Sequence, residues 1–221
     1  MRRLRFALSA VGFSGRMAVV PPSRAEAFSD GVLAVVITLL VLDLHADSSK
    51  GDLAGQLRHS WPTFVAYVVS FLVVGVIWVN HHALFALVER VDRVLLYENL
   101  LLLMFVTTMP FTTATLADFL REGGASARWA VLLYGISNTG MAFSFTALLA
   151  RMTRHGLLVT PVSEDVATRA IRRFGLGTIA YPAATALGLI WPPLILIAIA
   201  ALSTYYMVEQ TPILPTRTEA P

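Results

Sequence analysis

No cysteine occurs among the 221 residues of this chain, so disulfide bonds, thiol catalysis and cysteine metal sites are excluded. Charged residues are scarce as well, at 14% of the sequence, whereas 56% of the residues are hydrophobic. A mean hydropathy of +0.68 is too high for a water-soluble domain, and several apolar runs exceed the roughly 18 residues that can cross a bilayer. The composition therefore predicts a protein that crosses a lipid bilayer several times.

The sequence also lacks the short motifs that build common catalytic sites. It contains no Gly-x-x-x-x-Gly-Lys phosphate loop, no His-Glu-x-x-His zinc pair and no Gly-x-Ser-x-Gly elbow. The pI is near 9.6, but the basic residues lie between the apolar runs and form no stripe interleaved with aromatic side chains. We therefore expect neither an enzyme nor a nucleic-acid-binding protein, and no cofactor.

The apolar runs predict an all-α bundle of six membrane-spanning helices. The last two helices share one apolar stretch, in which Pro192-Pro193 is expected to separate them, because proline lacks an amide hydrogen and disfavours helix in the preceding residue. A single bent, re-entrant span in this stretch is the alternative. The expected spans are Arg24 to Ala46, Trp61 to Leu84, Val94 to Leu116, Trp129 to Ala150, Phe174 to Trp191 and Pro192 to Val208.

The distribution of basic residues predicts the orientation of these spans. If the N-terminus is cytoplasmic, thirteen of the 17 Lys and Arg residues lie on the cytoplasmic side and four lie outside. This bias places both termini inside, with a cytoplasmic N-terminal segment at 1–23, a transmembrane channel domain at 24–208 and a cytoplasmic tail at 209–221. The first 20 residues lack a clear signal-peptide cleavage site, so we expect no cleavage, and Met17 is an alternative initiator.

The first span contains polar residues that lipid tolerates only when they face protein or water. On a helical wheel, Ser29 and Asp30 point away from a stripe that is apolar except for one hydroxyl. The stripe consists of Gly31, Val35, Thr38, Leu39 and Leu42. Two interpretations remain open: rings of these residues form a hydrophobic constriction in a pore, or the stripe is a packing face whose threonine bonds back to its own helix.

Polar residues of the first three spans are expected to meet at the cytoplasmic side. Ser29 and Asp30 lie near the start of the first span, the segment Trp78 to His82 ends the second, and Asn99 lies near the start of the third. Because successive spans run in opposite directions, these three segments share one end of the bundle. The expected result is a buried polar network in which an intramembrane carboxylate is neutralised.

The adjacent residues His81 and His82 resemble a metal-binding pair only in composition. Neighbouring side chains on a helix diverge by about 100°, unlike an i, i+4 pair, so we expect no metal site here. Because histidine changes charge between pH 5 and 8, a pH-sensitive network is the favoured interpretation.

Several motifs resemble the signature of the bacterial relatives of transmembrane protein 175, an endolysosomal potassium channel. The resemblance covers Arg24 to Thr115 well and the later spans only by hydropathy. The motifs are Arg24-x-x-x-Phe28-Ser29-Asp30-Gly31, Ile37 to Asp43, Tyr67 to Phe71, Trp78-Val79-Asn80-His81-His82, Asn99 to Leu102 and Pro110-Phe111.

The resemblance implies a homotetrameric, potassium-permeable channel of a bacterial plasma membrane, with the first helices around the axis. The family lacks the Thr-Val-Gly-Tyr-Gly filter of ordinary potassium channels, and so does this sequence. Family selectivity is attributed to an apolar constriction, here Val35, Leu39 and Leu42, and to a nearby hydroxyl, here Thr38. Val35 is smaller than the leucine or isoleucine often found at its position, so the narrowest point is expected at Leu39 or Leu42.

The resemblance also implies a structural role for the residues around the cytoplasmic network. This set comprises Arg24, Phe28, Ser29, Asp30, Trp78, His81, His82 and Asn99. Two other functions remain open from the sequence. A proton-coupled secondary transporter would use Asp30 with His81 or His82 as a relay, and a membrane scaffold would conduct nothing.

The orientation can be tested by thiol labelling, because the absence of native cysteine gives a clean background. Cysteines that replace Lys50 and Ser126 should react with a membrane-impermeant reagent added from outside, and a cysteine that replaces Thr160 should not. Labelling of position 160 from outside would contradict both the charge distribution argument and the six-span topology.

Overall fold

The computed structural model describes residues 21–45 and 51–208, and within these ranges the chain is almost entirely helical. Four apolar segments there are long enough to cross a membrane: Pro22–Asp43, Trp61–Phe85, Arg93–Glu122 and Gly124–Arg154. The helices are α1 Pro22–Leu40, the 3-10 turn η1 Val41–Asp43, α2 Leu53–His59, α3 Trp61–Phe85, α4 Arg93–Thr107, α5 Met109–Glu122, α6 Gly124–Arg154, α7 Glu164–Gly175, α8 Gly177–Ile190 and α9 Leu194–Val208. This confirms the all-α fold.

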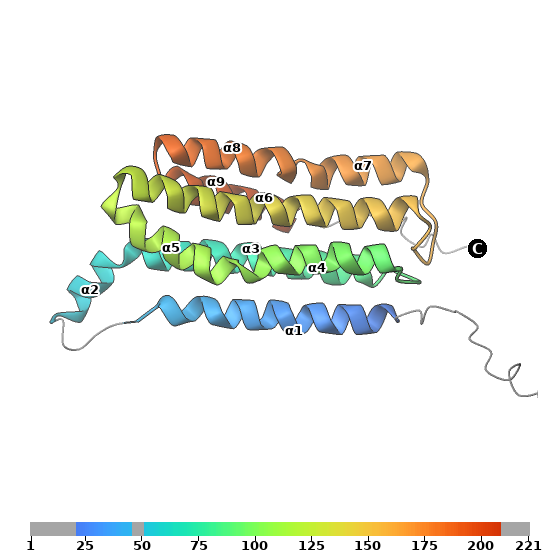
Figure 1. The fold of residues 1–221 in the computed structure, drawn as a ribbon, viewed down its shortest axis with the longest axis horizontal. Coiled ribbons are helices and arrows are strands. Elements are labelled where there is room, and N and C mark those ends of the chain that lie inside the picture. The colour runs from blue at the N-terminus through green and yellow to red at the C-terminus, as the bar shows by residue number, and fades with distance from the viewer. Residues whose placement is uncertain (1–20, 46–50, 209–221) are drawn as a thin grey trace, which may run out of the picture.

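The long helices run side by side, with α1 at one edge of the bundle and the α7–α8 pair at the opposite edge (Figure 1). The α1 helix packs on α3 and α4, and α6 packs on α4, α5, α7 and α8. The α1 residues Leu33, Val36 and Leu40 are at most 2% exposed, so one face of this helix enters the core. One side of α1 is thereby fixed, and the opposite side is left uncovered within a single chain.

The third expected span consists of two helices joined at Thr108. Pro110 lies at the start of α5, and because proline cannot donate an amide hydrogen, the hydrogen-bond ladder is interrupted between α4 and α5. The Thr108 hydroxyl donates to the Phe105 carbonyl at 2.6 Å and lies 2.8 Å from the Ser137 hydroxyl of α6. These bonds satisfy polar groups at the break inside the apolar region.

The last apolar stretch breaks where the two prolines predict. The α8 helix ends at Ile190, and α9 begins at Leu194 and packs back against α8. The described helices have 14 and 15 residues, which is shorter than the lengths of about 17 expected for these spans. The two helices are separate, but the count of six membrane crossings stays a prediction.

The α7 helix was not expected from the sequence, which suggested a cytoplasmic loop there. Ser163 accepts a hydrogen bond from the Val166 amide at the N-terminus of the helix. Acidic residues occupy its first turn and Arg172 and Arg173 its last turn, in agreement with the helix dipole. Ser163 followed by two acidic residues is a helix-start signal in the sequence. A search for long apolar spans does not detect a charged helix of 12 residues.

The close approach of α6 and α8 depends on a glycine. A Cβ atom built on Gly135 would lie 2.0 to 2.8 Å from side-chain atoms of Thr185 on α8. Small residues allow membrane helices to pack backbone against backbone, where dispersion and not the hydrophobic effect supplies the attraction. Gly135 therefore sets the distance between these two helices.

An ion pair connects the α3–α4 loop with the end of α6. Asp92 caps α4 by accepting the Leu95 amide at 2.8 Å, and its other oxygen accepts Arg151 Nε at 3.1 Å and Nη2 at 2.5 Å. Burial alone would raise the pKa of Asp92, but the hydrogen bonds from Arg151 and Leu95 outweigh it and hold the pKa below its usual range. The carboxylate is therefore charged in the folded protein under all but strongly acidic conditions.

Replacing Asp92 with asparagine should remove the ion pair while preserving the cap. We expect a loss of about 1 kcal/mol in the free energy of unfolding at pH 7, because the pair is partly exposed. A depressed carboxyl pKa stabilises the fold above the unfolded pKa of about 3.9, and this contribution is lost as the pH falls through the folded pKa. Unfolding measured in detergent from pH 7 downward should therefore show the difference closing below about pH 4.

The matched control is Glu89→Gln, which removes an exposed carboxylate from the same loop. It should change stability by less than about 0.5 kcal/mol at any of these pH values. A difference between wild type and Asp92→Asn that stays constant with pH would contradict the ion-pair assignment.

Candidate functional site

The stripe predicted on the first helix lies on the uncovered side of α1. Val35 is 56% exposed, Leu39 42% and Leu42 68%, and Gly31 and Thr38 are exposed as well. A run of exposed branched residues opposite a buried face is not required for packing within one chain. In the membrane this surface therefore faces lipid or another subunit.

The Thr38 hydroxyl has a defined orientation on this stripe. It donates to the Val35 carbonyl of its own helix at 2.8 Å, as threonine often does in membranes. Its hydrogen is thus engaged, but the hydroxyl is exposed and both lone pairs of its oxygen can still accept. Thr38 thus bonds back to its own helix and is also part of the exposed stripe. Its oxygen is available to a cation or a hydrogen-bond donor.

A chain of buried hydrogen bonds links α1, α4 and α3. Asn99 Nδ2 donates to the Ser29 hydroxyl at 2.8 Å, and that hydroxyl donates to the Ala25 carbonyl at 2.9 Å. His81 Nε2 lies 2.9 Å from Asn99 Oδ1. Because the amide oxygen can only accept, Nε2 carries the proton in this contact. Ser29, His81 and Asn99 are at most 2% exposed, so the chain lies inside the bundle.

With Nε2 bonded to Asn99, the other ring nitrogen of His81 has no partner in this series of hydrogen bonds. Nδ1 of His81 is buried and has no hydrogen-bond partner in the described part of the protein. The ring stacks on Phe85, with centroids 4.2 Å apart. A neutral imidazole fits this apolar contact better than a charged one, because a buried charge without a partner is costly. His81 is therefore a structural group in this arrangement.

A second cluster lies beside the buried chain and closer to the surface. Trp78 Nε1 donates to Asp30 Oδ1 at 3.1 Å, and His82 Nδ1 lies 2.8 Å from Glu26 Oε1. The rings of Trp78 and His82 stack with centroids 6.3 Å apart. Glu26 was not among the residues selected from the sequence, although its spacing of four from Asp30 puts both carboxylates on one face of α1.

Two residues of the expected network lie outside it. Phe28 is 55% exposed and Arg24 is exposed, on the same side of α1 as Val35. Among the described residues, none makes a hydrogen bond or an ion pair with the Arg24 guanidinium. His81 and His82 contact different partners, and their rings do not converge on one point.

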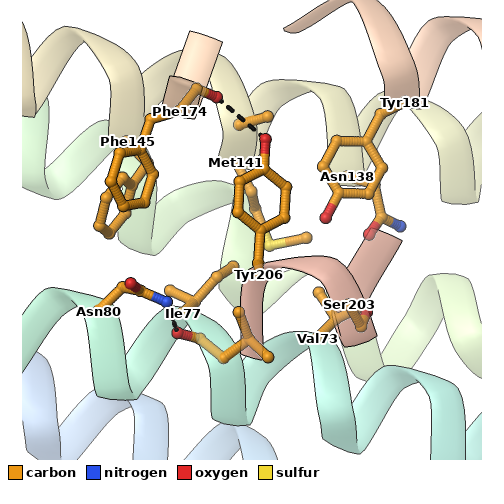
Figure 2. A pocket seen from close by; sticks show the side chains of 12 residues that line it. Val73, Ile77, Asn80, Asn138, Met141, Phe145, Phe174, Tyr181, Ser203 and Tyr206 are labelled. Carbon is orange, nitrogen blue, oxygen red and sulfur yellow. Dashed lines mark hydrogen bonds between the residues drawn. The ribbon is translucent and has the colours of Figure 1, made fainter. Parts of the chain in front are cut away.

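A partly open cavity of about 50 Å³ lies away from α1, between α3, α6, α8, α9 and the end of α7 (Figure 2). Asn138 Oδ1 is buried there without a partner in the described residues, and the Tyr206 hydroxyl donates to the Phe174 carbonyl at 3.2 Å. The volume is sufficient for a few water molecules, which would satisfy the amide oxygen. No α1 residue lines this cavity, so it is not continuous with the stripe.

A polar hollow of about 450 Å³ opens at the other end of α1, beyond the stripe. Asp43 and Asp118 line it, together with His45, His59 and Arg121. The Arg121 side chain donates to the His59 carbonyl at 2.8 Å. The hollow therefore places charges of both signs at the end of the exposed apolar stripe.

Comparison with known proteins agrees with these features. Residues 24–110 match the family model described as endosomal/lysosomal potassium channel TMEM175. A potassium channel of Streptomyces collinus is 47% identical over 202 residues, covering 89% of this chain and 96% of that protein. The human endosomal/lysosomal proton channel TMEM175 is 38% identical over 109 residues, covering 45% of this chain but only 22% of the human protein.

The fold has a solved counterpart. The crystal structure of a lysosomal potassium-selective channel TMEM175 homologue from Chamaesiphon minutus superposes with a TM-score of 0.73 and 34% sequence identity, over 86% of this chain and 98% of that chain. The Streptomyces relative matches nearly the whole length of both sequences, beyond the three helices that carry the motifs. The chain therefore belongs to the TMEM175 family of ion channels and is a multi-pass membrane protein that conducts cations, not an enzyme.

Proposed function

We propose that four copies of this chain assemble around α1 into a potassium-permeable channel of a bacterial plasma membrane, with both termini in the cytoplasm. The uncovered face of α1 supports this proposal most directly. A helix that is buried on one side and exposed along a stripe containing glycine and threonine is suited to a symmetry axis, where four such stripes face one another. The relatives named as potassium channels suggest the ion.

The stripe would form the constriction as a stack of rings. With a rise of about 1.5 Å per residue, Val35, Leu39 and Leu42 are separated by about 6 and 4.5 Å along the axis. An ion at such rings has to lose water without receiving a replacement ligand, so a narrow apolar pore is closed by dewetting. Residue size and polarity at these positions would then set the conductance.

The Thr38 hydroxyl would supply the only side-chain oxygen within the constriction. Its hydrogen is engaged with Val35, so four inward-facing oxygens would present lone pairs to a partly dehydrated cation. Selectivity in this proposal comes from oxygens and pore radius and requires no cofactor.

The buried hydrogen bonds would hold α1 in the rotation that directs the stripe to the axis. Ser29 lies about 120° from Val35 on the helix, so a bond from Asn99 to Ser29 turns the stripe outward from the subunit. This chain of bonds would determine assembly, whereas the stripe would determine permeation. The two sets of residues can therefore be tested separately.

Proton movement is the second candidate, because the human relative is named a proton channel. A hydroxyl and confined water in the constriction would also support proton transfer. A proton relay across the bundle would need to pass from Asp30 and His82 to His81. Asp30 and His82 lie close together beside Glu26, but His81 bonds to Asn99 instead and does not join them. A conducting pore is therefore favoured over a relay.

Recording from the purified protein in a planar bilayer separates these candidates. Under a potassium gradient at symmetric pH, the current of a potassium channel should reverse near the potassium Nernst potential. Under a pH gradient with equal potassium, reversal that follows the proton potential would favour the proton channel. Flux that requires a proton gradient and shows no unitary currents would indicate a transporter. Cross-linking of the same sample should stop at a tetramer.

Substitutions on the stripe should alter permeation. Leu39→Asn or Leu42→Asn should raise the current and weaken discrimination between potassium and sodium, because a polar ring relieves dewetting. Thr38→Ala should lower the ratio of potassium to sodium permeability roughly fivefold, which corresponds to about 1 kcal/mol of ligand contact. Bi-ionic reversal potentials measure the ratio.

The control must be exposed but off the stripe, which excludes Val36 and Leu40 because both are buried in the bundle. Val41→Asn comes nearest to this requirement, since Val41 is 45% exposed and its side chain diverges by about 100° from Leu42 and about 160° from Leu39. If Val41→Asn changes selectivity and Leu39→Asn does not, the stripe is a packing face and the pore assignment is wrong.

Substitution of Asn99 should affect assembly and leave selectivity nearly unchanged. Asn99→Leu removes both bonds to Ser29 and His81 and should cost about 1 to 3 kcal/mol, because membrane-embedded hydrogen bonds contribute modestly and the histidine N–H is left without a partner. Thermal unfolding and the tetramer fraction in detergent measure the effect. Thr107→Val on the same helix removes an exposed hydroxyl and should be almost neutral. A stable Asn99→Leu tetramer with altered selectivity would contradict the anchoring role.

A further inference from the structure

Three groups that commonly bind metal ions converge at the N-terminal end of α1. Glu26 and Asp30 come from successive turns of α1, and His82 comes from the last turn of α3. One ligand atom from each residue lies within 4.8 Å of the other two. The closest pair is His82 Nδ1 and Glu26 Oε1, at 2.8 Å. Two helices thus contribute a nitrogen and two carboxylates to one small volume.

We propose that Glu26, Asp30 and His82 bind a divalent transition-metal ion of the Zn²⁺ type. Zinc lies about 2.0 to 2.2 Å from nitrogen and oxygen ligands, so ligand atoms that share one ion are roughly 3 to 4 Å apart. Carboxylate rotations of about 1 Å close the present separation. Imidazole favours Zn²⁺ over the all-oxygen sites that Mg²⁺ and Ca²⁺ prefer.

The surroundings fit a metal site in two further respects. The His82 side chain is 60% exposed, so an ion can enter and water can complete its coordination. Trp78 orients two of the ligands, since its indole N–H donates to Asp30 and its ring stacks on His82. A carboxylate fixed by one donor keeps lone pairs for the ion, and such supporting contacts tune metal affinity.

Metal binding would connect α1 to α3 next to the buried bonds of Ser29, Asn99 and His81. It would replace the direct contact between His82 and Glu26 with two bonds to one ion, and it would neutralise carboxylates on a helix that lies in the membrane. This site does not depend on the proposed pore, because its ligands lie off the exposed stripe.

Calorimetric titration of the full chain with Zn²⁺ tests the proposal. The protein should be purified in detergent without a polyhistidine tag, and the absence of cysteine removes the usual competing ligands. We expect one ion per chain, bound also in the presence of excess Mg²⁺. Co²⁺ should bind at the same stoichiometry and report oxygen and nitrogen ligands by its visible absorption.

Single substitutions identify the ligands. Glu26→Gln, Asp30→Asn and His82→Gln should each weaken Zn²⁺ binding at least about tenfold, and Trp78→Phe, which keeps the ring but loses the N–H, should weaken it about tenfold. Size-exclusion profiles verify that each variant is folded, and Glu26→Gln is the most conservative of them. The controls His59→Gln and His155→Gln alter histidines elsewhere in the chain and should bind as wild type does.

Two results would overturn the proposal. The first is a wild-type protein that binds no Zn²⁺, in which case the His82–Glu26 contact is only a hydrogen-bonded pair. The second is binding that survives both Glu26→Gln and His82→Gln but is lost in His59→Gln, which would assign the ion to the polar hollow at the other end of α1.

Discussion

The requirement that buried polar groups be paired inside a low-dielectric membrane protein determines the placement of α1. Ser29, Asn99 and His81 come from three helices, and the bonds of Asn99 to Ser29 and to His81 form only while those helices keep one rotation and one depth. A rotation of α1 by one residue would move Ser29 away from Asn99 and leave the amide unpaired. The hydrogen bonds therefore select one rotation of α1, whereas apolar packing alone would allow several.

The exposed face of α1 follows from this constraint. Once Ser29 faces inward, the 100° step of the helix turns Val35 and Leu42 outward, and Leu33 and Leu40 fill the core. The two faces differ in composition only slightly, since both consist mostly of branched residues. The polar anchor, more than hydrophobicity, distinguishes the face that packs from the face that is available to other subunits or lipid.

Most of the fold could be predicted from the sequence, because membrane-spanning helices are recognisable as long apolar runs. The second span was located to within one residue, and the proline pair marks the break after α8. The α7 helix and the break at Thr108 were missed. The α7 helix is amphipathic, so it does not stand out as an apolar run. The break at Thr108 depends on one proline inside an apolar run, which leaves the average hydropathy of that run unchanged.

The polar network was only partly accessible to such reasoning. The directions of the spans were enough to bring Asn99 near Ser29, because both lie at the same end of the bundle. They could not tell that His81 and His82 take different partners, or that Arg24 remains outside, since those outcomes depend on side-chain rotamers. The roles of Val35, Thr38, Leu39 and Leu42 in permeation stay predictions, because a single chain does not include the neighbouring subunits of the proposed tetramer.

The contact between Gly135 and Thr185 has a consequence for how this sequence can diverge. Any side chain at position 135 would occupy space that now belongs to the threonine on α8, so the first position cannot enlarge unless the second shrinks or the helices separate. Evolution at the two sites is therefore expected to be coupled, with relatives that carry alanine or serine at position 135 having glycine or alanine at position 185.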